Sequence, residues 1–141
     1  MAWGSQRARF SPIIPVKAPG QIVLFVIILA LAIASPLFAF RARQTLGKEW
    51  SVTARLVEGH RLVTQGPYRV VRNPIYTGMF GMLLATGLAI SHWIGLVVAI
   101  IVFATGTMIR VRNEEKLLRD AFGTEFDDYA RRVPAVVPFL F

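Results

Sequence analysis

Residues 66–78 read Gly66-Pro67-Tyr68-Arg69-Val70-Val71-Arg72-Asn73-Pro74-Ile75-Tyr76-Thr77-Gly78. The Gly66-Pro67 pair favours a turn, because proline presets φ and glycine accepts backbone conformations that other residues avoid. The Asn73-Pro74 pair predicts a helix start, because the residue before proline avoids the helical region and proline suits the first helical position. We therefore expect a basic, irregular loop that becomes a membrane helix at Pro74 and collects polar groups at the membrane surface.

The composition is that of a membrane protein. The chain has 141 residues, of which 55% are hydrophobic, which is too apolar for an ordinary soluble domain of this size. Its net charge of +8 has two explanations, nucleic-acid binding or basic cytoplasmic loops. In an apolar chain the second explanation is favoured, so we expect no nucleic-acid partner. The sequence has no cysteine and only two distant histidines, so we expect no metal site.

Two apolar runs predict three membrane spans. Residues 1–20 form a polar tail, and the uncharged residues 21–40 would make a helix of about 30 Å, which matches the hydrocarbon core of a bilayer. The uncharged run 75–109 would be about 52 Å long as a single helix. We therefore divide it into spans at about 75–90 and 93–109 that form a tight hairpin.

A cleaved signal peptide is the alternative for the first span. Basic residues precede the apolar run, and Ala32-Ile33-Ala34 has the small-x-small form of a cleavage site. Cleavage would export the loop 41–74 with seven of the sixteen basic residues, against the positive-inside rule. We therefore favour a retained span.

The charged residues after Ile109 predict short C-terminal helices in the segment 110–141. Glu115 and Arg119 are opposite charges four apart, which supports a helix that continues out of the membrane. Gly123 suits the C-cap of this helix. Thr124, followed three residues later by Asp127, resembles a capping box that opens a second helix.

The charge distribution predicts the orientation. Seven basic residues lie in 41–74 and six after residue 109, whereas the turn at 91–92 has none. The loop 41–74 and the C-terminus should therefore share the cytoplasmic side. This topology brings two sets of polar residues together at the membrane boundary, where such residues suggest a ligand site. They are His60, Tyr68, Arg69, Arg72, Asn73 and Tyr76 on one side, and Arg110, Arg112, Glu114 and Glu115 on the other. The alternative is an exposed Arg110–Glu114 ion pair worth little.

Two motifs resemble the isoprenylcysteine carboxyl methyltransferase and phospholipid methyltransferase superfamily. The first is the run Gly66-Pro67-Tyr68-Arg69-x-x-Arg72-Asn73-Pro74-x-Tyr76-x-Gly78. The second is Glu114-Glu115-x-x-Leu118-x-x-x-Phe122-Gly123-x-Glu125-Phe126-x-x-Tyr129-x-x-x-Val133-Pro134. The shorter pieces at residues 46–51 and 60–64 are similar to it as well. The resemblance extends from about residue 20 to residue 141. In the family, further spans that help to enclose a prenyl substrate precede the region that this chain resembles.

This resemblance implies an all-α integral membrane methyltransferase of a short, bacterial-type form in the inner (plasma) membrane, with residues 21–141 as its domain. It implies S-adenosylmethionine (AdoMet) as cofactor and no metal. The implied cofactor contacts are His60, Arg61, Leu62, Val63, Tyr68, Asn73, Pro74, Ile75, Tyr76 and Glu114. Arg110 takes the position that orients the substrate, and Asn73 replaces a histidine found in eukaryotic carboxyl methyltransferases.

The residue types agree with these roles. Glu114 can accept hydrogen bonds from the ammonium or hydroxyl groups of AdoMet, and the rings of Tyr68 and Tyr76 can face adenine or the sulfonium. Arg110 favours an anionic, lipid-like acceptor that enters from the bilayer, because guanidinium binds carboxylate in a bidentate manner. Two other functions stay open: phospholipid N-methylation, and a small membrane protein without catalytic activity.

Overall fold

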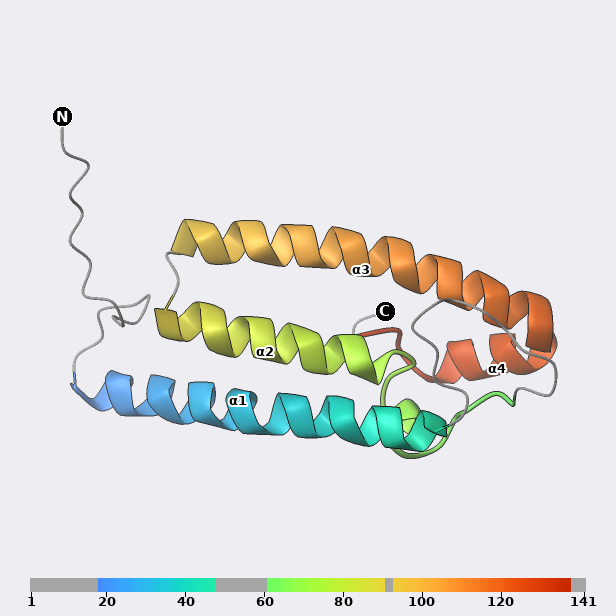
Figure 1. The fold of residues 1–141 in the computed structure, drawn as a ribbon, viewed down its shortest axis with the longest axis horizontal. Helices are drawn as coiled ribbons and strands as arrows, with labels where there is room; N and C mark the ends of the chain where they lie inside the picture. Colours follow the sequence, from blue (N-terminus) through green and yellow to red (C-terminus); the bar gives the residue numbers. More distant parts are fainter. Residues whose placement is uncertain (1–17, 48–60, 91–92, 138–141) are drawn as a thin grey trace.

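The computed structural model describes residues 18–47, 61–90 and 93–137 (Figure 1). Their elements are α1 (Ala18–Leu46), the 3-10 helix η2 (Gly66–Arg69), α2 (Pro74–Ile90), α3 (Trp93–Phe122) and α4 (Thr124–Arg132). Throughout these ranges the regular elements are helical, which confirms the all-α class for the described part of the chain.

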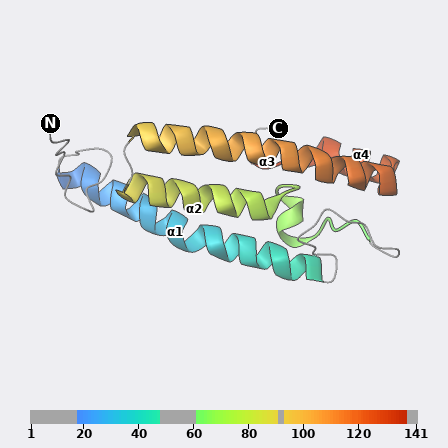
Figure 2. The same ribbon diagram turned by 45° about the horizontal axis from the view of Figure 1, so that its top comes forward.

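The three long helices lie side by side with α2 in the middle, as both ribbon views show (Figures 1 and 2). Small residues bring α1 and α2 together. A Cβ atom on Gly78 would lie 2.7 Å from the carbonyl oxygen of Ser35 and 2.7 Å from the Cβ of Ala39. Gly81 faces Ser35 in the same way, and Ala85 is buried. Small residues at these positions let the two helix backbones approach closely.

Gly95 does not serve the same purpose. A Cβ atom there would meet no described atom within 4 Å, so no helix approaches closely at this glycine. The contact between α2 and α3 includes Phe80 and Phe103, stacked at 5.8 Å between ring centroids. It also includes Gly87, where a Cβ atom would lie 2.3 Å from Cδ1 of Leu96.

Helix α1 extends beyond the predicted span 21–40 in both directions, from Ala18 to Leu46. The predicted loop 41–74 is therefore wrong for residues 41–46. Ala42 is fully buried, whereas Arg41 and Arg43 are exposed. The apolar run ends at Phe40, but arginine and glutamine are good helix formers, so the helix continues after the charge begins.

Helix α3 continues without a break from the apolar residues into the charged segment, as predicted. Gly123 has φ 53° and its N–H donates to the Arg119 carbonyl at 2.8 Å, which confirms it as the C-cap. The same glycine is the N-cap of α4, which has no side-chain cap bond. The predicted capping box at Thr124 and Asp127 is therefore wrong, because Thr124 already lies inside the helix.

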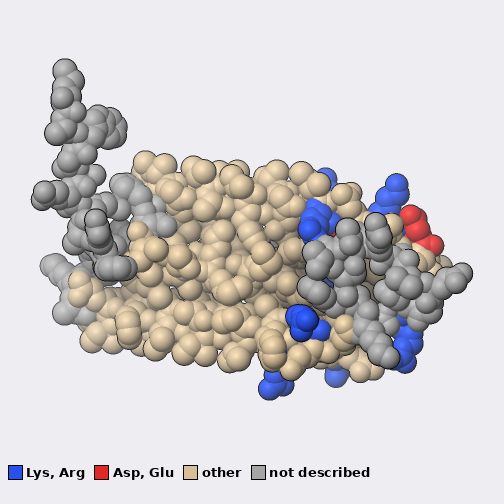
Figure 3. Space-filling view, in the orientation of Figure 1, with Lys and Arg blue, Asp and Glu red and all other residues tan. Residues whose placement is uncertain are grey.

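Helices α1 and α3 are long and apolar enough to cross a membrane. Only 6% of the most apolar window of each is buried, whereas the core helix of a soluble protein is mostly buried. Helix α2 has 17 residues and is shorter than this test requires. Among the described residues on this face, the charged side chains gather at one end of the molecule (Figure 3). An apolar body with one polar end is the form of a membrane protein.

Candidate functional site

The polar end of the molecule combines the turn before α2, the charged C-terminal part of α3 that begins at Arg110, and helix α4 (Figure 1). We call this part of α3 its exit. The hydroxyl of Tyr76 donates to Oε1 of Glu114 at 2.9 Å. Nε of Arg110 donates to the same oxygen at 3.0 Å. Three predicted site residues from two distant stretches of sequence thus meet at one carboxylate oxygen. We call them the Tyr76–Glu114–Arg110 cluster.

This cluster is open enough to admit a ligand. The side chain of Arg110 is 51% exposed and that of Glu114 is 26% exposed. Glu114 holds the guanidinium of Arg110 from one turn along α3, which limits the directions in which Arg110 can point. The cluster therefore presents a half-exposed cation beside a partly covered anion at the edge of the apolar body.

Tyr68 lies beneath this cluster as part of the packed interior. The residue is only 7% exposed, so its ring does not offer the open aromatic face that the residue types suggested. Burial raises the pKa of the Tyr68 hydroxyl, and the nearby Tyr129 and Glu114 raise it further. The hydroxyl of Tyr129 donates to the backbone carbonyl of Tyr68 at 2.6 Å. Burial also raises the pKa of Tyr129, to about 12.

The residues at the start of α2 bind the C-terminal part of the chain. The side-chain amide of Asn73 donates to the Ala135 carbonyl at 3.1 Å, and its backbone N–H donates to the same oxygen at 2.8 Å. Pro74 is buried and Ile75 is half-buried. The predicted cofactor contacts of these three residues stay predictions.

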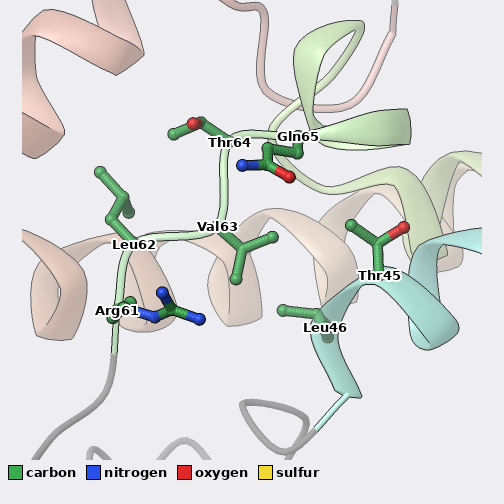
Figure 4. Close-up of a pocket in the computed structure, with 7 residues that line it drawn as sticks. All are labelled: Thr45, Leu46, Arg61, Leu62, Val63, Thr64 and Gln65. Atoms are coloured by element: carbon green, nitrogen blue, oxygen red, sulfur yellow. The ribbon is translucent and has the colours of Figure 1, made fainter.

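A cavity of about 330 Å³ lies at the same end, between the last turn of α1 and residues 61–65, which precede η2 (Figure 4). Its size is at the lower end of the range for small-molecule sites, about 300–1,000 Å³. Its lining residues are Thr45, Leu46, Arg61, Leu62, Val63, Thr64 and Gln65. Arg61, Leu62 and Val63 were predicted cofactor contacts, whereas His60 lies outside the described residues.

The cavity and the cluster are two places, because neither Tyr76 nor Glu114 lines the cavity. One short segment joins them, since η2 begins directly after Gln65 and its Tyr68 N–H donates to the Gln65 carbonyl at 3.1 Å. Thr45 and Leu46 were missed because the first helix was predicted to end at Phe40. The helix-forming residues after Phe40 were the available signal.

Arg72 and Glu115 form a second bridge that the sequence did not predict. Nε of Arg72 lies 2.8 Å from Oε1 of Glu115, and the two side chains are 13% and 17% exposed. The spacing had paired Glu115 with Arg119, but Arg119 bonds Asp127 of α4 at 2.7 Å. In the described ranges no three His, Cys, Asp or Glu residues are grouped to hold a metal ion.

Comparisons with known proteins agree on one kind of protein. The model of the family described as phospholipid methyltransferase matches residues 22–125. The protein-S-isoprenylcysteine O-methyltransferase B of Arabidopsis thaliana is 32% identical over 98 residues, which are 68% of this chain and 50% of that protein. A nickel-cobalt-cadmium resistance protein of Alcaligenes xylosoxydans xylosoxydans is 35% identical over 99 residues, 68% of this chain and 45% of its own length.

A solved structure has the same arrangement of helices. The structure of the eukaryotic intramembrane Ras methyltransferase, an isoprenylcysteine carboxyl methyltransferase, aligns with a TM-score of 0.75 and 26% identity. The alignment covers 84% of this chain and 43% of that one. The chain thus spans about half the length of the relatives that it matches.

Proposed function

Because the chain belongs to the phospholipid methyltransferase family, we propose that it is an integral membrane methyltransferase that uses S-adenosylmethionine. Its acceptor is a lipid-like or carboxylate-bearing amphiphile, as in protein-S-isoprenylcysteine O-methyltransferases. The observation that carries this proposal is the Tyr76–Glu114–Arg110 cluster at the polar end of an apolar layer of helices.

The donor groups fit AdoMet, which supplies an electrophilic methyl group when bound. Glu114 would hold its ammonium or ribose hydroxyl groups, because a carboxylate accepts such bonds strongly. Arg61, Leu62 and Val63 line a cavity large enough for part of a nucleoside, and their neighbours Thr45 and Gln65 add polar atoms to its wall. His60, Asn73, Ile75 and Tyr76 complete the proposed cofactor site, and the buried Tyr68 and Pro74 would support it from beneath.

Arg110 would orient the acceptor. It is half exposed and held by Glu114, so it can bind an anion without a large loss of side-chain freedom. A carboxylate acceptor is ionised at neutral pH and needs no base, and the remaining task of the site is to position the reacting groups. Access from the bilayer suits an amphiphile, because the helices next to the cluster expose apolar side chains.

The membrane arrangement follows from the same polar end. We propose that α1, α2 and α3 all span the bilayer, with the short C-terminal helices and the site on the cytoplasmic side of a bacterial inner membrane. Helix α2 is about 25 Å long, near the lower limit for a span. The gathering of charged residues at one end supports this orientation (Figure 3).

A binding experiment tests the proposal. The full chain, purified in a mild detergent, should bind AdoMet in a calorimeter, and membranes that contain it should transfer a radiolabelled methyl group to a lipid or prenylated acceptor. Absence of binding at millimolar AdoMet would leave a membrane protein without catalytic activity. Label on the amino headgroup of a phospholipid would instead favour N-methylation, which the description of the family makes the second candidate.

A further inference from the structure

Four consecutive backbone carbonyls of the C-terminal segment, residues 133–136, are held by the turn at the start of α2. The Val133 carbonyl accepts from Nη1 of Arg72, and the Pro134 carbonyl accepts from the Arg72 N–H at 2.8 Å. The Ala135 carbonyl accepts from Asn73, and the Val136 carbonyl accepts from the hydroxyl of Thr77. A segment that is bound at every residue acts as a strap across this end of the molecule.

Arg72 joins the strap to the exit of α3. Its Nη1 also donates to the Ala130 carbonyl at 2.7 Å, and its Nε donates to Glu115 at 2.8 Å. One guanidinium therefore connects α3, the end of α4 and the strap. The side chains of Arg72 and Glu115 are mostly covered, so each would be costly to leave without the other.

This bridge lies directly beside the cluster. Arg72 and Tyr76 are four residues apart, and their partners Glu115 and Glu114 are neighbours on α3. Two parallel connections thus link the same pair of stretches. The covered Arg72–Glu115 bridge sets the distance and rotation of α3 against the start of α2, and these determine where the more exposed Glu114 stands.

We propose that Arg72 is a positioning residue that fixes Glu114 against Tyr76, and that it does so only when the strap is seated. This inference rests on the proposed function, because it gives residues 133–136 a role in AdoMet binding although they do not line the proposed site. The guanidinium is essential to it. Lysine would keep the charge but could not reach a carboxylate and two carbonyls together.

The test compares three variants with the parent protein: Arg72→Lys and the control Arg119→Lys, both full-length, and a truncated chain that ends at Arg132. The control alters the exposed bridge between Arg119 and Asp127 at the same end of the molecule. We expect AdoMet affinity to fall by about 10-fold or more in Arg72→Lys and in the truncated chain and to stay within about 2-fold in the control, with the helix content unchanged in all. Parent-like affinity in folded Arg72→Lys would overturn the proposal.

A double-mutant cycle separates positioning from a general loss of stability. Arg72 bonds Glu115, whereas Tyr76 bonds Glu114. If Arg72 acts by positioning Glu114 against Tyr76, the affinity losses of Arg72→Lys and Tyr76→Phe should not add, because both disturb the position of Glu114. Additive losses would mean that Arg72 only stabilises the fold, and would overturn the inference.

A parent chain that binds no AdoMet would contradict the proposed function instead. Hydrogen exchange at the Asn73 amide would then decide whether Arg72 seats the strap. Arg72→Lys should accelerate this exchange and Arg119→Lys should not, and equal exchange in both variants would overturn the role of Arg72.

Discussion

The hydroxyl of Tyr76 lies 2.9 Å from Oε1 of Glu114, which joins the first turn of α2 to the point where α3 becomes charged. The two residues are 38 positions apart. A ligand held by Glu114 would therefore contact both of the stretches that carry the family resemblance.

Glu114 should be required for the cofactor. Glu114→Gln keeps the shape of the side chain but removes the charge that holds Arg110 and the proposed ammonium of AdoMet. Since a hydrogen bond to a charged group is worth about 1.5–3 kcal/mol, affinity should fall about 10- to 150-fold in calorimetry. The matched control is Glu125→Gln, an exposed glutamate in the first turn of α4, which should bind like the parent. Unchanged affinity in Glu114→Gln would mean that the cofactor lies elsewhere.

Arg110 should act on the acceptor and spare the cofactor. Arg110→Ala is expected to retain AdoMet binding but to lower kcat/KM for a carboxylate acceptor about 10- to 100-fold, the value of one charge-assisted interaction. Steady-state kinetics with the calorimetric Kd measured in parallel separates the two effects. The neighbouring exposed Arg112→Ala is the control. Loss of AdoMet affinity in Arg110→Ala would contradict the assigned role.

The contact between α1 and α2 should not tolerate a larger residue at Gly81. A Cβ atom there would lie 2.1 Å from Oγ of Ser35 and 2.9 Å from its Cβ, so Gly81→Val must push the helices apart. Overpacking of this kind costs about 1–3 kcal/mol, which should appear as a lower midpoint in detergent or thermal unfolding followed by circular dichroism. Gly106→Val meets no described atom within 4 Å and should unfold like the parent. Equal midpoints for the two variants would exclude the close packing.

Tyr129 should make stability depend on alkaline pH. Burial raises the pKa of its hydroxyl to about 12, from about 10 in the unfolded chain, so the neutral form is favoured in the folded state. The contribution of the neutral Tyr129 hydroxyl to folding stability is therefore complete below about pH 10 and is lost as the pH rises through 12. Tyr129→Phe should unfold more easily at pH 8, by about 1 kcal/mol for the lost bond to the Tyr68 carbonyl, and its stability should fall less between pH 10 and 12. Parallel curves for the variant and the parent would contradict this assignment.

The proposed orientation can be measured with single cysteines, because the natural sequence has none. A cysteine in place of Asp120, which is exposed after the charged exit of α3, should react with an impermeant maleimide only after the cells are opened. A cysteine in place of Ser91, between α2 and α3, should react in intact cells that have a permeable outer membrane. The reverse pattern would invert the orientation, and equal labelling of both would exclude a hairpin that crosses the membrane twice.

The sequence by itself determined the class of the protein and most of its helices. Uncharged runs, the Asn73-Pro74 start and Gly123 are local features, and their effect on the backbone does not depend on distant contacts. The predicted all-α class and the starts of α2 and α3 agree with the structure for this reason. The meeting of residues 66–78 with the exit of α3 was also predictable, because the spacing of the apolar runs places both at one end.

Only the tertiary structure decided the partners of the charged side chains. Spacing along one helix paired Glu115 with Arg119, but Glu115 bonds Arg72 in a mostly covered pair, and Arg119 bonds Asp127 of α4 in an exposed one. Both partners come from segments outside α3. The burial of Tyr68 and the bonding of residues 133–136 to the start of α2 depend in the same way on segments about 60 residues apart. Such contacts have no local pattern, because their energy comes from groups that folding alone brings together.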